Sequence, residues 1–191
     1  MVDELDKSIT LLRNQNEMYF KQLKDLIIQL KNKNRIQLLS YFTYSLSISH
    51  DPGQESLCFG SYHLTNTGTV PLINPYICIK LSENSPFTLS GKYTYDSSKP
   101  SSKNPGGWQR MNEKTDKEEF WLKPINTEVI NPEETISFSN FQVKWISDMD
   151  YAGSVLGFAY SKEVPEGAAV LNPISLNGTT FSRGDKDDQT S

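Results

Sequence analysis

The sequence has few of the residues on which catalytic and metal sites are usually built. Among 191 residues there are two cysteines and two histidines, and His50 and His63 lie in different segments. A zinc site needs several Cys or His ligands at regular spacing, and the short acidic groups at 116–119 and 147–150 lack the spacing of a calcium loop. No G-x-S-x-G motif is present. We therefore expect no metal, no cofactor and no enzymatic activity, and we expect His63 to be a polar strand residue.

Basic clusters and long apolar runs are also missing. The formal net charge is -4 and the pI is about 5.2, whereas a nucleic-acid binder needs clustered cations to neutralise phosphates. No segment approaches the ~18 continuous apolar residues that cross a bilayer. We therefore expect neither nucleic-acid binding nor membrane insertion.

The first residues lack the features of a secretory signal peptide. Asp3, Glu4 and Asp6 stand where a signal peptide carries basic residues, and no continuous apolar core follows them. We expect cytoplasmic synthesis, compatible with later incorporation into a particle or a spore surface. In that environment Cys58 and Cys78 are expected to be buried or half-buried free thiols.

Glycine and proline are absent before Pro52, and residues 1–35 follow a helical heptad pattern. A coiled coil buries its a and d positions between helices. Here those positions are Val2, Leu5, Ile9, Leu12, Asn16, Tyr19, Leu23, Leu26 and Leu30. The polar Asn16 at an a position penalises wrong registers, because its amide must find a partner across the seam. The segment predicts a homo-oligomer, either a dimer or a trimer.

The second half of this helix has a wider apolar face than a two-stranded coil needs. Phe20 and Ile27 occupy e positions, and Ile28 lies beside them. Either the oligomer contains more than two helices, or the helix docks on the rest of its own chain. We favour self-association, because an isolated helix of this length is marginal without a partner surface.

From residue 36 the period of the apolar residues changes to two, which is typical of strands. Phe42, Tyr44, Leu46 and Ile48 alternate with Thr and Ser, so this strand is expected to bury one face. Seven to nine such strands predict a mainly β protein with an N-terminal helix, in which residues 36–176 form an antiparallel sandwich of immunoglobulin-like or jelly-roll-like type. Residues 96–107 are expected to be a mobile loop, and residues 177–191 a polar tail.

Two motifs carry a resemblance to a known family. In "LTNTGTVPL", Asn66 and Gly68 are expected to take the left-handed φ of a tight corner before Pro71. This corner and the later "INPEETISF" resemble the v-x-N-x-G-x-x-p and l-x-P-G-E-x-x-x-f motifs of immunoglobulin-like modules in bacterial and archaeal surface proteins. Glu133 stands where those modules have Gly. The resemblance implies a sandwich fold of non-catalytic adhesive and structural modules, and it names no activity.

Three tryptophans raise the alternative of carbohydrate recognition, since flat aromatic rings stack on sugars. Trp121 and Trp145 lie among apolar strand residues and are expected in the core. Trp108 follows two glycines, and it either anchors the loop or contacts a ligand together with Arg110, Tyr93 and Tyr95. The leading prediction is a structural or binding module that is oligomerised by its helix and presents sandwiches to a protein partner. The glycan-binding module is the alternative.

Overall fold

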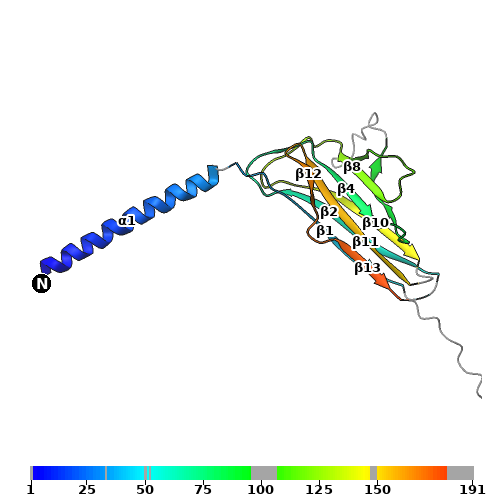
Figure 1. The fold of residues 1–191 in the computed structure, drawn as a ribbon, viewed down its shortest axis with the longest axis horizontal. Coiled ribbons are helices and arrows are strands. Elements are labelled where there is room, and N and C mark those ends of the chain that lie inside the picture. The colour runs from blue at the N-terminus through cyan, green and yellow to red at the C-terminus, as the bar shows by residue number, and fades with distance from the viewer. Residues whose placement is uncertain are drawn as a thin grey trace, which may run out of the picture. The chain divides into compact units, whose positions relative to one another are not determined.

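The computed structural model describes residues 2–32, 34–49, 51, 53–95, 107–146 and 150–179, and it leaves the side chains of 2–6 and 30–32 outside the description. The chain divides into two compact units, Met1–Arg35 and Ile36–Ser191. The first contains the helix α1 (Val2–Asn32), and the second contains the strands (Figure 1). Most of the loop predicted at 96–107 and of the tail predicted at 177–191 lies outside the described residues.

The second unit contains all the strands. They are β1 (Leu38–Ser47), β2 (Glu55–Asn66), β3 (Leu72–Ile73), β4 (Tyr76–Leu81), β5 (Thr88–Ser90), β6 (Tyr93–Thr94), β7 (Trp108–Arg110), β8 (Glu119–Pro124), β9 (Val129–Ile130), β10 (Thr135–Ile146), β11 (Tyr151–Ser161), β12 (Val164–Ala169) and β13 (Ile174–Gly178). The protein is thus mainly β with one N-terminal helix, as the periodicity predicted.

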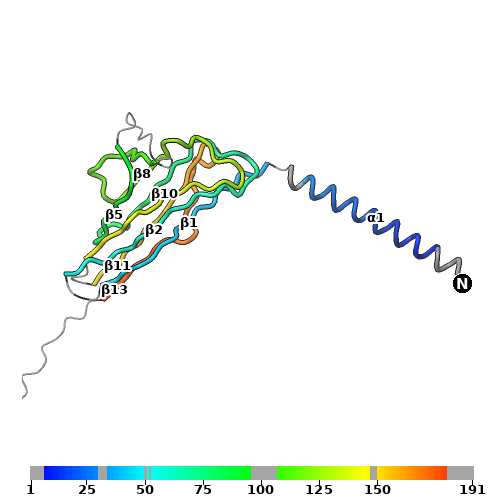
Figure 2. The backbone as a smooth tube through the Cα atoms, turned by 180° about the vertical axis from the view of Figure 1, so that it is seen from behind, coloured from blue at the N-terminus to red at the C-terminus, as the bar shows by residue number. Residues whose placement is uncertain are grey.

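The strands form two main sheets. One has the order β1-β2-β10-β5, and the other has the order β12-β11-β4-β8-β7-β6 with β13 also paired to β11. The short strands β3 and β9 pair separately. All pairings are antiparallel except that of β6 with β7. Figure 2 shows β1, β2 and β10 running alongside one another.

The inward-facing side chains of both sheets form one hydrophobic core. Its largest members are aromatic, and Phe42 meets Tyr62 and Phe141 edge to face at centroid distances of 4.9 and 5.7 Å. Trp145 is buried in this core, as expected. Cys58 and Cys78 are free and buried.

The expectation that β1 buries one whole face is wrong for its second half. Phe42 is buried, but Tyr44, Leu46 and Ile48 are each 43% exposed. The reason is that β1 is an edge strand. Only its first half is covered along the edge, where the amide of Leu171 donates to the carbonyl of Ser40 at 2.9 Å.

The predicted left-handed φ at Asn66 and Gly68 is also wrong, because neither residue is among those with positive φ. Asn66 instead shapes the corner through its buried side-chain amide. Its Nδ2 donates to the carbonyls of Val70 at 2.8 Å and Ile130 at 2.9 Å, and its Oδ1 accepts from the amide of Gly68 at 3.0 Å. One side chain therefore joins three backbone groups of two separate segments.

Glu133 adopts the left-handed conformation at the position where the similar modules have Gly, with a φ of 67°. It follows Pro132, and the amide of Glu134 donates to the carbonyl of Asn131 at 3.0 Å. Proline in the second place and a positive φ in the third are the features of a type II turn. The turn therefore forms with a residue that is strained in this conformation.

Replacing Glu133 by glycine is expected to raise the free energy of unfolding by about 0.5–1 kcal/mol, because relief of the left-handed strain outweighs the added freedom of the unfolded chain. Urea unfolding measures the change. Glu128→Gly is the matched control, since Glu128 is also exposed but has no positive φ, and it should lower stability. Equal effects of the two substitutions would contradict the prediction.

Candidate functional site

The described a and d side chains of α1 are all exposed in the single chain. They are Ile9, Leu12, Asn16, Tyr19, Leu23 and Leu26. The side chains of Val2, Leu5 and Leu30 lie outside the described residues. An amphipathic helix gains most of its stability from burying its apolar stripe, so this surface is the first candidate for a binding site.

Apolar side chains on α1 extend beyond the a and d positions. Phe20 and Ile27 at e positions are exposed, with Ile28 beside them, whereas Leu11 and Met18 are exposed at c positions, which lie away from the seam. The exposed face is therefore wider than the narrow seam of a two-stranded coil.

The four residues predicted to contact a ligand lie together, on β6, on β7 and at Tyr95, which follows β6. Tyr93 is opposite Trp108 in the parallel pairing, and the rings of Tyr93 and Tyr95 are 5.7 Å apart. Arg110 donates from Nη1 to the Tyr95 hydroxyl at 3.3 Å. Its guanidinium carbon lies 4.2 Å from the ring centroid of Phe120, within cation–π distance.

Trp108 does not offer its ring to a ligand, because it is only 3% exposed. Its Nε1 donates to the carbonyl of Ser137 at 3.1 Å, and its ring packs edge to face on Phe138 at 5.7 Å. The proposed ligand contact is therefore corrected: this tryptophan anchors the end of the loop to the core.

Arg110 is likewise buried, at 4% exposure, and its donors are used inside the protein. Nε donates to Oδ1 of Asn112 at 3.0 Å, and Nη2 donates to the carbonyls of Glu119, at 3.0 Å, and Asp116. These bonds hold the segment between β7 and β8. Tyr95 is the member of the predicted set with an exposed ring, and the Nζ of Lys114 lies 4.7 Å from its centroid.

The acidic group at 116–119 is used for structure. Asp116 accepts from the amide of Glu119 and from the Asn112 side chain, and the backbone bond is the main reason that the pKa of Asp116 is lowered. Glu119 accepts from Lys80 at 2.8 Å and from Trp121 at 3.0 Å, which lowers its pKa. Within the described residues no group of three or more His, Cys, Asp and Glu side chains could hold a metal ion.

Trp121 was expected in the core, but it lies half-buried on the outer face of the larger sheet. It belongs to an aromatic cluster in which its ring lies 5.4 Å from Tyr160, and Tyr160 stacks on Tyr76 at 4.8 Å. Cys78 is opposite Trp121 in the register, and burial raises the pKa of its thiol to about 12. The sequence signal was the alternation in β8, since Trp121 shares its face with Glu119 and Lys123 whereas Phe120 and Leu122 point inward.

His63 bridges three strands on the outer face of the smaller sheet. Its Nε2 and Nδ1 each lie 2.8 Å from a hydroxyl, those of Thr43 and Ser137, and its ring stacks on Tyr41 at 4.8 Å. Partial burial lowers the pKa of His63, which favours the neutral ring that can donate to one hydroxyl and accept from the other.

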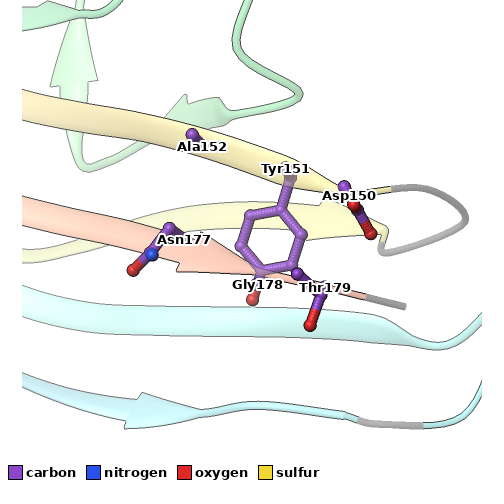
Figure 3. Close-up of a pocket in the computed structure, with 6 residues that line it drawn as sticks. All are labelled: Asp150, Tyr151, Ala152, Asn177, Gly178 and Thr179. Atoms are coloured by element: carbon purple, nitrogen blue, oxygen red, sulfur yellow. The ribbon is translucent and has the colours of Figure 1, made fainter. Parts of the chain in front are cut away.

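A depression of about 500 Å³ lies at the ends of β11 and β13. Figure 3 shows its lining residues Asp150, Tyr151, Ala152, Asn177, Gly178 and Thr179. The Tyr151 ring lies over Gly178, where an added Cβ would come within 2.7 Å of the ring. The described lining contains one carboxylate, that of Asp150.

Comparison with protein-family models finds no match, and neither does comparison with curated proteins. Among solved structures, AvmM, which catalyses macrocyclisation in alchivemycin A biosynthesis, is 7% identical, with 80% of this chain and 93% of that chain covered and a TM-score of 0.36. The ASH/PapD-like domain of human CEP192 (PapD-like domain 7) is 12% identical, with 74% and 84% covered and a TM-score of 0.31. These similarities are too weak to carry a functional argument. No helix among the described residues is both long and apolar enough to cross a membrane.

Proposed function

We propose that this protein is a non-enzymatic structural or binding module that forms a homo-oligomer, a dimer or trimer, through α1. Each copy presents an immunoglobulin-like β-sandwich for assembly or ligand contacts, as a component of a phage or spore particle or of a scaffold would. The observation that carries the proposal is the exposed heptad seam of α1. Gathering several copies raises the effective concentration of their binding surfaces.

The spacing and composition of the seam support self-association. Complete burial of a Leu or Ile side chain contributes roughly 1.5–3 kcal/mol, and knobs-into-holes packing of a and d residues on a second copy provides that burial. Asn16 lies in the middle of the seam, where a matching Asn on a neighbouring helix pairs its amide in one register only. The apolar e positions Phe20 and Ile27 favour three helices over two.

The sandwich part of the proposal is supported by the second unit. Two sheets, antiparallel except for the β6–β7 pair, share one hydrophobic core. The Asn66 corner and the Glu133 turn, the two segments that carry the resemblance to immunoglobulin-like modules, are joined by backbone hydrogen bonds between Asn66 and residues 133 and 134. The glycan-binding alternative has less support, because Trp108 and Arg110 are buried and occupied by internal contacts.

Leu11 and Leu12 provide a matched pair of substitutions. They are 62% and 60% exposed in the single chain, but Leu12 is at a d position and Leu11 is at a c position. Leu12→Lys should abolish association through the helix and so lower the mass of the oligomer, because it buries a charge at the seam. Leu11→Lys should leave the mass of the oligomer unchanged, because c positions face solvent. Light scattering on the full chain measures both masses.

If the wild-type chain is monomeric, or if both variants keep the same mass, helix-driven oligomerisation is wrong. The helix would then dock within its own chain, and Leu12→Lys would lower the stability of a monomer instead. Urea unfolding of the same variants distinguishes that outcome, since a seam between copies makes the unfolding midpoint depend on protein concentration.

A further inference from the structure

The second half of β1 is a sheet edge whose outward backbone groups have no partner among the described residues. The Asn172 side chain bonds both backbone groups of Phe42: its Oδ1 accepts from the Phe42 N–H at 2.8 Å, and its Nδ2 donates to the Phe42 carbonyl at 2.9 Å. Both backbone groups therefore point away from β2. In an antiparallel ladder this direction repeats at every second residue, so the N–H and C=O groups of Tyr44 and Leu46 point the same way. Beyond Phe42, the described part of the chain provides no strand or side chain that bonds to them.

The same residues carry an uncovered apolar row. Tyr44, Leu46 and Ile48 share the inward face of Phe42, yet each is 43% exposed. Natural edge strands are usually protected by charged residues, proline or a bulge. The stretch 38–49 has no charged residue and no proline, and its pairing with β2 is continuous from Leu38 to Ser47. This edge lacks all three protections.

We propose that the edge pairs antiparallel with the β1 edge of a second copy, centred on Leu46. In that register Leu46 lies opposite Leu46 of the second copy, and Tyr44 lies opposite Ile48. The residues whose backbone groups point outward then face each other, as an isologous contact requires. The absence of charge removes repulsion between identical strands, and pairing covers the apolar row on both copies.

Strand pairing joins chains of different helix oligomers, a consequence that rests on the proposed function. In the centred register the two Leu38 residues lie about 53 Å apart at ~3.3 Å per residue. Within one parallel coiled coil, the two Leu38 residues are separated by at most two linkers, each running from Asn32 to Leu38, plus the ~10 Å between packed helices. This sum reaches the required distance only when both linkers are fully extended. A parallel coiled coil therefore leaves its β1 edges free for neighbouring oligomers, and the two contacts together build open assemblies.

The test separates the strand contact from the helix contact by using full-length chains that carry Leu12→Lys. Sedimentation velocity across a wide range of protein concentration should show a monomer–dimer equilibrium. Adding Leu46→Pro should weaken it about tenfold or more, because proline removes the outward N–H, which takes no part in the β1–β2 ladder. Leu46→Lys should do the same, by placing like charges opposite each other. Ser47→Lys adds the same charge to the exposed opposite face and should leave the equilibrium unchanged.

Two results would overturn the proposal: a Leu12→Lys chain that stays monomeric at every concentration, or a dimer that Leu46→Pro does not weaken. A monomer would direct attention to an extended peptide of another protein as the occupant. Failure of the helix proposal gives a different result. The Leu12→Lys chain would then have the same mass as the wild-type chain, while the dimer formed by strand pairing would persist. Urea unfolding of each variant checks that the fold is retained.

Discussion

Replacement of Asn66 by alanine is expected to lower the free energy of unfolding by about 3 kcal/mol. The Asn66 side chain is fully buried and makes three hydrogen bonds to backbone groups, those of Val70, Ile130 and Gly68. Truncation leaves these buried groups without this partner, and each such loss costs about 1–3 kcal/mol. Urea unfolding of the full chain measures the change.

Asn131→Ala is the control for this substitution. Asn131 is an exposed asparagine of the neighbouring turn, and its side-chain bond to Glu134 is also exposed. The expected change is within about 0.5 kcal/mol. Similar losses at both positions would show that the buried amide of Asn66 contributes no more than a surface turn.

Asn66→Asp tests the direction of the amide. At neutral pH this substitution places a carboxylate, which cannot donate, against two carbonyl oxygens. We therefore expect a greater loss of unfolding free energy than with alanine. Burial and these oxygens raise the folded-state pKa of the introduced carboxyl above its unfolded value near ~3.9. The folded state then holds the proton more tightly, so stability falls as pH rises through that window and is partly restored in acid. A loss that does not change with pH, relative to wild type, would contradict the assigned direction of the amide.

The second large effect is expected for Gly157→Ala in β11. A Cβ at this position would lie 2.2 Å from Cε2 of Tyr62 and 3.0 Å from Cζ of Phe42. Both rings are buried and pack edge to face, so neither can rotate into free space. Overpacking of this kind costs about 3 kcal/mol, and thermal or urea unfolding measures it.

The same substitution in a Tyr62→Leu background provides the control. The shorter side chain leaves room for the added methyl, so Gly157→Ala should then cost less than about 1 kcal/mol. A cost that is the same in both backgrounds would show that the backbone, and not the Tyr62 ring, requires glycine. The four proteins form a double-mutant cycle whose coupling energy reports the contact directly.

Local patterns predicted the elements of this protein well. The change of apolar period near residue 36 separates the helical residues from the strands because a helix repeats every 3.6 residues and a strand every two. The strand pattern also placed Phe42 and Trp145 on inward faces. These properties depend on neighbours along the chain, so the sequence alone was enough for them.

Trp121 shows what required the tertiary structure. Its hydrophobicity predicted burial in the core, but its position between Phe120 and Leu122 turned it to the outer face, where it meets Tyr76 and Tyr160 from strands far away in the sequence. Trp108 is the opposite case. The sequence left it either as an anchor of the loop or as a ligand contact, and a carbonyl from β10 holds it inside.

The sequence by itself predicted the helical character of α1, the β character of the second unit and the positions of the turns at Asn66 and Glu133, because each depends on the spacing or chemistry of consecutive residues. Only the tertiary structure decided that the side-chain amide of Asn66 is buried and that the donors of Arg110 bond to groups within the protein. It also decided that β1 lies at the edge of its sheet, with Tyr44 and Leu46 exposed. Those outcomes depend on which strands become neighbours, and strand order is set by packing between segments that are distant along the chain.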